Sequence, residues 1–130
     1  MYSETEENQM AKRRYVQVNE LKPEMVETYK NAHETMHLGP WKEQLDVLKK
    51  GGAEDCIVWL YKNYAIMLYT CDDIAESFAA LGRDPRRPAW DEFTAPMFAA
   101  CPKFDGTGEI PHLEKIFDLR EQIEGKKTEF

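Results

Sequence analysis

Cysteine is scarce in this sequence and follows no pairing pattern. The three cysteines, Cys56, Cys71 and Cys101, are an odd number and form no Cys-x-x-Cys pair. This argues against a disulfide-stapled scaffold or a paired-cysteine zinc site, and it suits the reduced thiols of a cytoplasmic protein. We therefore expect all three side chains to be small buried apolar groups.

Positive charge and long apolar runs are also in short supply. Lysine and arginine together number 17 against 24 aspartates and glutamates, which gives a formal net charge of -7. Because nucleic acids and anionic membranes attract a concentrated basic surface, we expect neither as a partner. No apolar run approaches the roughly 18 residues of a membrane span, and the first ten residues are polar where a signal peptide is apolar. We expect a soluble, cytoplasmic protein.

The sequence also lacks internal repeats and linker-like segments. With 130 residues, the chain has the length of one domain. We expect a polar lead over residues 1–10, a single α+β domain over 11–122 and a polar tail over 123–130. The hydrophobic fraction of 42% is ordinary for a folded protein, so this domain has enough apolar side chains for one core.

Four segments carry the signals of β-strands. Alternating or β-rich residues predict strands at 14–19, 56–61, 64–70 and 113–119. Two residues, Lys62-Asn63, separate the second strand from the third. Such a short connection predicts a β-hairpin.

Proline, glycine and capping residues predict the helices. Pro23 is suited to the first turn of a helix, and Gly39-Pro40 is expected to interrupt that helix. Asp73 and Glu76 have the spacing of a capping box. The predicted helical segments span residues 23–37, 41–50, 73–81 and 89–98.

The order of these elements is β-α-β-β-α-β, the ferredoxin-like α+β pattern of an antiparallel sheet with helices on one face. The second strand is apolar on both sides, with Cys56, Val58 and Leu60 facing one way and Ile57, Trp59 and Tyr61 the other. Helices cover only one face, so the other face needs a second cover or holds a ligand cleft. We expect a homodimer, in a dimeric α/β-barrel-type assembly.

The segment HETMH, residues 33 to 37, matches the HExxH signature of zinc metalloproteases. Two histidines four residues apart on a helix can bind one metal ion, with Glu34 as a base. No third histidine follows at metzincin spacing, and His112 is far along the chain. Glu34 also falls on the polar side of the predicted helix. We therefore expect no metal site, and a zinc hydrolase stays a minor alternative.

One arc of the same helix carries a different pair of side chains. At about 100° per residue, Tyr29, Ala32, His33 and Met36 share the core-facing stripe, and His37 lies at its margin. A lone histidine on such a stripe is most often structural. Here, however, a tyrosine lies one turn before the histidine and both face a possible cleft. This makes a functional role about as probable as a structural one.

Five segments in order resemble the L-rhamnose mutarotase family. They are YVQVN, YKNAH, PWKEQLDVLKKGGAEDCIVWL, Asp84 to Trp90 and LEKIFDL, and they cover about residues 12 to 120. The resemblance implies a dimeric ferredoxin-like domain. It also implies an isomerase that interconverts the α and β anomers of a 6-deoxyhexose monosaccharide without a cofactor.

The resemblance assigns roles to residues near the first helix. The family's Tyr-x-x-x-His motif matches Tyr29, which implies substrate binding, and His33, which implies proton donation. The family's next tryptophan follows its histidine by four residues, whereas Trp41 follows His37 by four and His33 by eight. Either this chain has an extra helical turn or His37 is the catalytic equivalent. We favour His33, keep His37 as the alternative, and take Trp41 as a substrate contact.

Two further positions depart from the family's pattern. Cys56 stands where the family has a substrate-contacting tyrosine, and Ala89-Trp90 stands where it has two tryptophans. Trp90 carries over as a sugar-binding residue, and Cys56 is expected at the same pocket position with different chemistry. The reaction type is unaffected, but the sugar stays open between L-rhamnose, L-fucose and a related sugar.

Anomer exchange requires a proton on the ring oxygen and removal of the proton from the anomeric hydroxyl. A histidine that titrates near neutral pH is suited to one of these transfers, and Tyr29, the second histidine or a water molecule can supply the other. We therefore predict a mutarotase. The competing class is a noncatalytic sugar-binding dimeric α+β protein in which His33 is structural.

Overall fold

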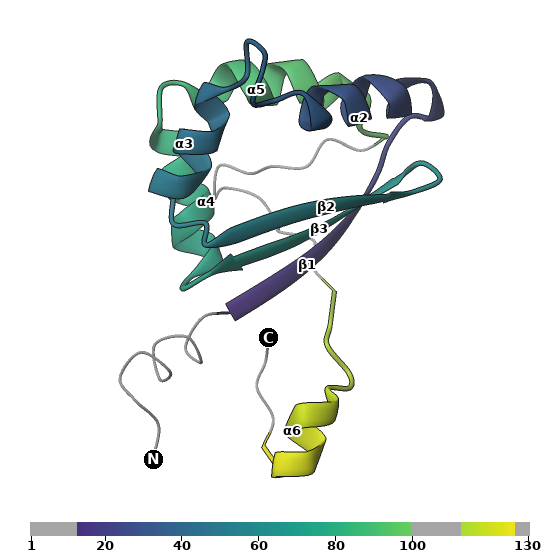
Figure 1. Cartoon of the computed structure of the whole chain (residues 1–130), viewed down its shortest axis with the longest axis vertical. Coiled ribbons are helices and arrows are strands. Elements are labelled where there is room, and N and C mark those ends of the chain that lie inside the picture. Colours follow the sequence, from purple (N-terminus) through teal and green to yellow (C-terminus); the bar gives the residue numbers. More distant parts are fainter. Residues whose placement is uncertain (1–12, 100–112, 127–130) are drawn as a thin grey trace.

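The computed structural model describes residues 13–99 and 113–126. Its centre is an antiparallel sheet of three strands, β1 (Arg13–Glu20), β2 (Asp55–Tyr61) and β3 (Tyr64–Cys71), in the order β1-β3-β2 (Figure 1). β1 and β2 each pair with β3, which is the central strand, so β1 and β2 form the two edges of the sheet. The three predicted strands in this part of the chain are confirmed.

The turn between β2 and β3 confirms the predicted hairpin. Lys62 has a positive φ of 55°, the left-handed conformation that a two-residue connection requires. The Asn63 side chain donates a hydrogen bond to the backbone carbonyl of Leu21, and the backbone carbonyl of Asn63 accepts from the Leu21 amide. These bonds tie the hairpin turn to the end of β1.

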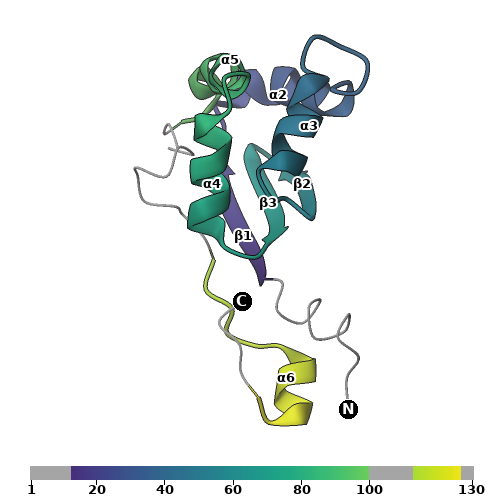
Figure 2. The same ribbon diagram turned by 90° about the vertical axis from the view of Figure 1, so that its left-hand side faces the viewer.

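The helices of residues 23–97 lie over one face of the sheet, which confirms the α+β class (Figure 2). They are η1 (Pro23–Met25), α2 (Val26–Glu34), α3 (Glu43–Lys50), α4 (Ile74–Arg83), α5 (Arg87–Thr94) and η2 (Ala95–Met97). At the start of α4, the Glu76 amide donates to the Asp73 carboxylate at 3.0 Å, as the capping-box spacing predicted. The predicted helix at 89–98 begins two residues earlier and ends as a 3₁₀ turn.

The first predicted helix is shorter than expected, because α2 ends at Glu34 rather than His37. Thr35 stops it, since its hydroxyl donates to the backbone carbonyl of Asn31 and its own backbone is no longer helical. Turns then lead to α3, which begins at Glu43 instead of Trp41. A helical arc therefore includes His33 but does not include His37.

The predicted fourth strand at 113–119 is wrong. Residues 113–118 have no regular structure, and α6 (Leu119–Glu124) follows. The Glu121 amide donates to the Asp118 carboxylate at the start of α6, so a capping box in this segment favoured a helix over a strand. One backbone hydrogen bond, from Leu113 to the carbonyl of Val16, joins this segment to the edge of β1. α6 also continues past residue 122, where we predicted the domain to end.

The sheet has two faces of different character. Towards the helices, Tyr15, Tyr69 and Phe78 belong to a buried core. On the opposite face, β2 exposes Ile57, Trp59 and Tyr61, as the alternation predicted. Within residues 13–99 and 113–126, the helices are too short or too polar to cross a bilayer.

Candidate active site

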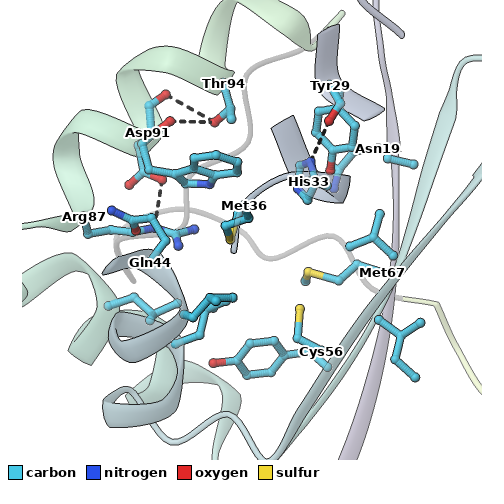
Figure 3. A pocket seen from close by; sticks show the side chains of 18 of the residues that line it. Asn19, Tyr29, His33, Met36, Gln44, Cys56, Met67, Arg87, Asp91 and Thr94 are labelled. Carbon is cyan, nitrogen blue, oxygen red and sulfur yellow. Dashed lines mark hydrogen bonds and ion pairs between the residues drawn. The ribbon is translucent and has the colours of Figure 1, made fainter. Parts of the chain in front are cut away.

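A cavity of about 480 Å³ lies between the sheet and the helices that cover it. This volume is within the range of about 300–1,000 Å³ that is usual for small-molecule sites. All three strands and α2 to α5 contribute side chains to its wall (Figure 3). The strands supply mainly apolar side chains, such as Val58, Ala65 and Met67. The cavity wall is thus mainly apolar and includes a few polar side chains.

His33 lines this cavity from the last turn of α2 and is half-buried. Its Nδ1 lies 2.8 Å from the backbone carbonyl oxygen of Tyr29. Since a carbonyl oxygen only accepts, Nδ1 carries the hydrogen, and in the neutral ring Nε2 keeps its lone pair. Burial lowers the pKa of His33, and the nearby positive charge of Arg87 lowers it further against the opposing effect of the carbonyl. The neutral, proton-accepting form is favoured at pH 7.

Tyr29 lies one helical turn before His33 and is buried. The two rings are in contact, with centroids 4.2 Å apart. Burial raises the pKa of Tyr29 to about 12, and the neighbouring Cys56 adds to the shift. The phenol therefore keeps its proton at working pH. Its hydroxyl has no hydrogen-bond partner among the residues described, so it is available to a ligand.

Cys56 and Trp90 line the cavity from β2 and α5. Burial raises the pKa of the Cys56 thiol to about 11, so this side chain is a neutral thiol and not a thiolate. Its place in the wall is the pocket position that the family resemblance implied, whereas Cys71 has the fully buried packing role that we expected for cysteines. Trp90 meets His33 edge to face, with ring centroids 5.2 Å apart, so the imidazole contacts both Trp90 and Tyr29.

Two predicted site residues are set apart from this group. Trp41 is not among the residues that line the cavity; it packs behind Trp90 and stacks on Phe93 at 4.9 Å. His37 does line the cavity, but it is an exposed residue in the turn after α2. The structure therefore brings four predicted site residues together in the cavity wall and leaves His37 at the rim. The four are Tyr29, His33, Cys56 and Trp90.

Several polar residues of the cavity wall were missed by the sequence reasoning. They are Asn19, Gln44, Arg87, Asp91 and Thr94. For Gln44 a signal existed, since it precedes Val47 and Leu48 by three and four residues and so shares the core-facing stripe of α3. For Arg87 no sequence signal existed, because an arginine after Arg86 reads as an exposed charge.

The zinc interpretation of HETMH finds no support in this geometry. The helix that would present both histidines on one face ends between them. Among residues 13–99 and 113–126, no group of three histidine, cysteine or acidic side chains is arranged to hold a metal ion. His112 lies outside the described residues, as does Cys101.

Fold and site define a small antiparallel α+β domain with a small-molecule cavity under its helices, and a half-buried histidine lines that cavity. A sequence profile of the L-rhamnose mutarotase family matches residues 14–119, and the chain belongs to this family. The fold is similar to that of an L-rhamnose mutarotase from Formosa agariphila, with a TM-score of 0.57 and 19% identity over 82% of this chain and 98% of the other. No curated protein sequence matches.

Proposed function

We propose that this protein is a sugar mutarotase that interconverts the α and β anomers of an L-6-deoxyhexose, with L-rhamnose as the first candidate and L-fucose or a related sugar as the second. Family membership supports the reaction class. The observation that carries the proposal is the arrangement of His33, whose Nδ1 is held by the Tyr29 carbonyl so that Nε2 is free for a ligand in the cavity.

The chemistry requires one proton to move from one oxygen of the sugar to another. In our proposal, neutral His33 takes the proton of the anomeric hydroxyl through Nε2. The electron pair forms the C1=O1 bond of the aldehyde, the C1–O5 bond breaks, and O5 receives a proton from the imidazolium. Because O1 and O5 are bonded to the same carbon, one imidazole can serve both. After rotation about C1–C2, closure reverses both transfers.

The neighbours of His33 suit this role. Tyr29, protonated at working pH, can donate a hydrogen bond to a sugar oxygen, and Trp90 offers an apolar edge for the C–H groups of a sugar ring. Cys56 and Met67 provide an apolar surface for the methyl group of a deoxy sugar. No step calls on a cofactor. Positioned acid–base catalysis typically contributes about 10²- to 10⁴-fold in rate, which is adequate for a reaction that already occurs in water.

We also propose that the working protein is a homodimer in the cytosol. The sheet face away from the helices exposes Trp59, Ile57 and Val18, with Trp59 50% exposed, and an apolar patch of this kind is typical of an interface. α6 has no buried residue and adds exposed Ile123 on the outer side of the sheet (Figure 1). A second copy packed on this face covers both.

The dimer has a direct test. Trp59→Glu is expected to shift the protein from dimer to monomer in sedimentation equilibrium. Leu38→Glu is the matched control, because Leu38 is 76% exposed but lies in the turn after α2. A monomeric wild type, or a Trp59→Glu variant that remains a dimer, contradicts the proposed interface.

The activity is tested by NMR saturation transfer between the anomeric protons of L-rhamnose, L-fucose and several other aldoses. The proposal predicts faster exchange with enzyme than in buffer, with L-rhamnose accelerated most. If the protein binds a sugar but accelerates no exchange, the noncatalytic sugar-binding alternative is correct. If L-fucose or another sugar is accelerated most, the reaction stands and the substrate is reassigned.

A further inference from the structure

One wall of the cavity holds an amide with an unsatisfied acceptor. Gln44, in the first turn of α3, is 1% exposed and lines the cavity. Its Nε2 donates to the backbone carbonyl of Arg86 at 2.8 Å, which fixes the orientation of the amide. Its Oε1 is buried and has no hydrogen-bond partner among the described residues. Buried acceptors of this kind are rare in folded proteins, and one that lines a cavity indicates a missing donor.

A guanidinium with unused donors lies beside this amide. Arg87, the first residue of α5, is buried and lines the same cavity. Its Nε donates to the carboxylate of Asp91 at 3.0 Å. The two terminal nitrogens make no further hydrogen bond to the described residues. Because Gln44 is hydrogen-bonded to Arg86, the residue before Arg87, the side chains of Gln44 and Arg87 lie on the same wall of the cavity (Figure 3).

Donors and an acceptor on one wall are complementary to hydroxyl groups. A hydroxyl can accept from Arg87 and donate to the Oε1 of Gln44 at the same time. An ionised carboxylate cannot, since it has no proton for that oxygen and would meet its lone pairs. Asp91 moreover already balances the charge of Arg87. The wall therefore favours a neutral polyol over an anion.

The β2 and β3 side of the cavity offers few hydrogen-bonding groups. Cys56 is a neutral thiol and only a weak hydrogen-bonding group. Val58 and Met67 beside it are apolar. The helices contribute two polar pairs, His33 with Tyr29 and Arg87 with Gln44, and the wall also holds Asn19, Glu34 and Asp91.

We propose that Arg87 and Gln44 form a hydroxyl-recognition subsite that binds secondary hydroxyl groups of the sugar ring and decides which neutral aldoses are accepted. The inference rests on the proposed function for the identity of the ligand. Its own claim concerns specificity: the subsite holds the ring while His33 acts at the anomeric carbon.

The test compares L-rhamnose with its 2-, 3- and 4-deoxy analogues. Anomer exchange is measured by saturation transfer, and binding is measured by calorimetry. A subsite that hydrogen-bonds a hydroxyl rejects an analogue lacking it by at least about tenfold in kcat/KM, because its polar groups stay unpaired. At least one analogue is therefore expected to lose this factor with the wild-type enzyme. Equal kcat/KM for all four sugars overturns the proposal without any variant.

Variants then assign the discrimination to its residues. Arg87→Met and Gln44→Leu are expected to raise KM for L-rhamnose about tenfold, to change kcat less, and to make the discriminated analogue nearly equal to L-rhamnose. Arg87→Lys keeps the charge and should recover part of the discrimination. Arg86→Met is the matched control, because Arg86 forms ion pairs with Asp84 and Asp46 outside the cavity and uses only its backbone carbonyl towards Gln44.

The outcomes separate the two proposals. If the wild type accelerates no exchange of L-rhamnose, the mutarotase function fails, and the calorimetric preference for L-rhamnose over the deoxy analogues still tests the subsite. If exchange is accelerated but folded Arg87→Met and Gln44→Leu keep the wild-type KM and selectivity, the subsite is wrong. Tighter binding of D-glucuronate than of L-rhamnose also overturns it. Thermal melts of each variant identify those that fold.

Discussion

The two histidines of HETMH lie in different surroundings, although only three residues separate them. His33 is in the last turn of α2, is half-buried, and contacts the rings of Tyr29 and Trp90. His37 is in the following turn and is exposed. The backbone carbonyl of Tyr29 fixes the tautomer of His33. Residues at i and i+4 therefore share a face only where the helix continues through both of them.

The same difference decides which histidine is suited to proton transfer. Burial and Arg87 lower the pKa of His33, so its imidazole is neutral and its free nitrogen is basic at pH 7. A side chain held in one tautomer and one orientation also loses less conformational entropy when it reaches the reactive geometry. The following variants test this comparison.

Replacement of His33 has the largest expected effect. His33→Ala removes the proposed proton-transfer group, so kcat for anomer exchange should fall by about 10²- to 10⁴-fold. The measurement is saturation transfer at saturating L-rhamnose. Calorimetric binding of the sugar to the variant serves as the control for an intact cavity. A loss below about threefold would assign the proton transfer to another group.

Loss of the Tyr29 hydroxyl has a smaller expected effect. Tyr29→Phe keeps the ring contact with His33 and removes one hydrogen bond to the sugar, a change of about 0.5–1.5 kcal/mol or roughly 2- to 10-fold in kcat/KM. Exchange rates measured over a range of L-rhamnose concentrations give kcat/KM for the variant and for the wild type. A loss as large as that of His33→Ala would show that the phenol itself transfers a proton.

Replacement of His37 is expected to change little. His37→Ala removes an exposed side chain at the rim, so kcat should stay within about threefold of the wild type. The variant is measured beside His33→Ala under identical conditions. The reverse ranking of the two variants would restore the register in which His37 is the catalytic histidine.

Metal removal has the smallest expected effect. Because His33 and His37 do not share a helical face and no third ligand joins them within the described residues, dialysis against EDTA should leave the exchange rate unchanged. Metal analysis of the same sample accompanies the assay. Activity that disappears with EDTA and returns with zinc would instead support a functional zinc site at His33 and His37.

The fold was predictable where local signals agreed with packing. The Lys62-Asn63 turn and the Asp73–Glu76 cap are local, and both form as expected. The end of α2 was not predictable from periodicity, because apolar Met36 continues the stripe after the helix has stopped at Thr35. In the last segment, apolar residues indicated a strand, but the Asp118 cap favoured a helix.

The site was predictable in part for a related reason. Tyr29 and His33 are one turn apart on one helix, so their meeting follows from spacing alone. Gln44 and Arg87 lie near each other because the Gln44 side chain donates a hydrogen bond to the backbone carbonyl of Arg86, the residue before α5. Such a contact depends on tertiary packing and on the burial of an arginine, neither of which a single sequence reveals.

The dependence of kcat/KM on pH, measured together with the NMR titration of the His33 ring, tests the central claim most directly. In the proposed mechanism the neutral imidazole is the active form, and its pKa is lowered, so activity should rise as pH increases through a value below 6.5 and then stay level. That midpoint should coincide with the titration of His33 in the free enzyme. A midpoint that does not follow His33, or that persists unchanged in His33→Ala, would contradict the assignment of His33 as the proton-transfer group.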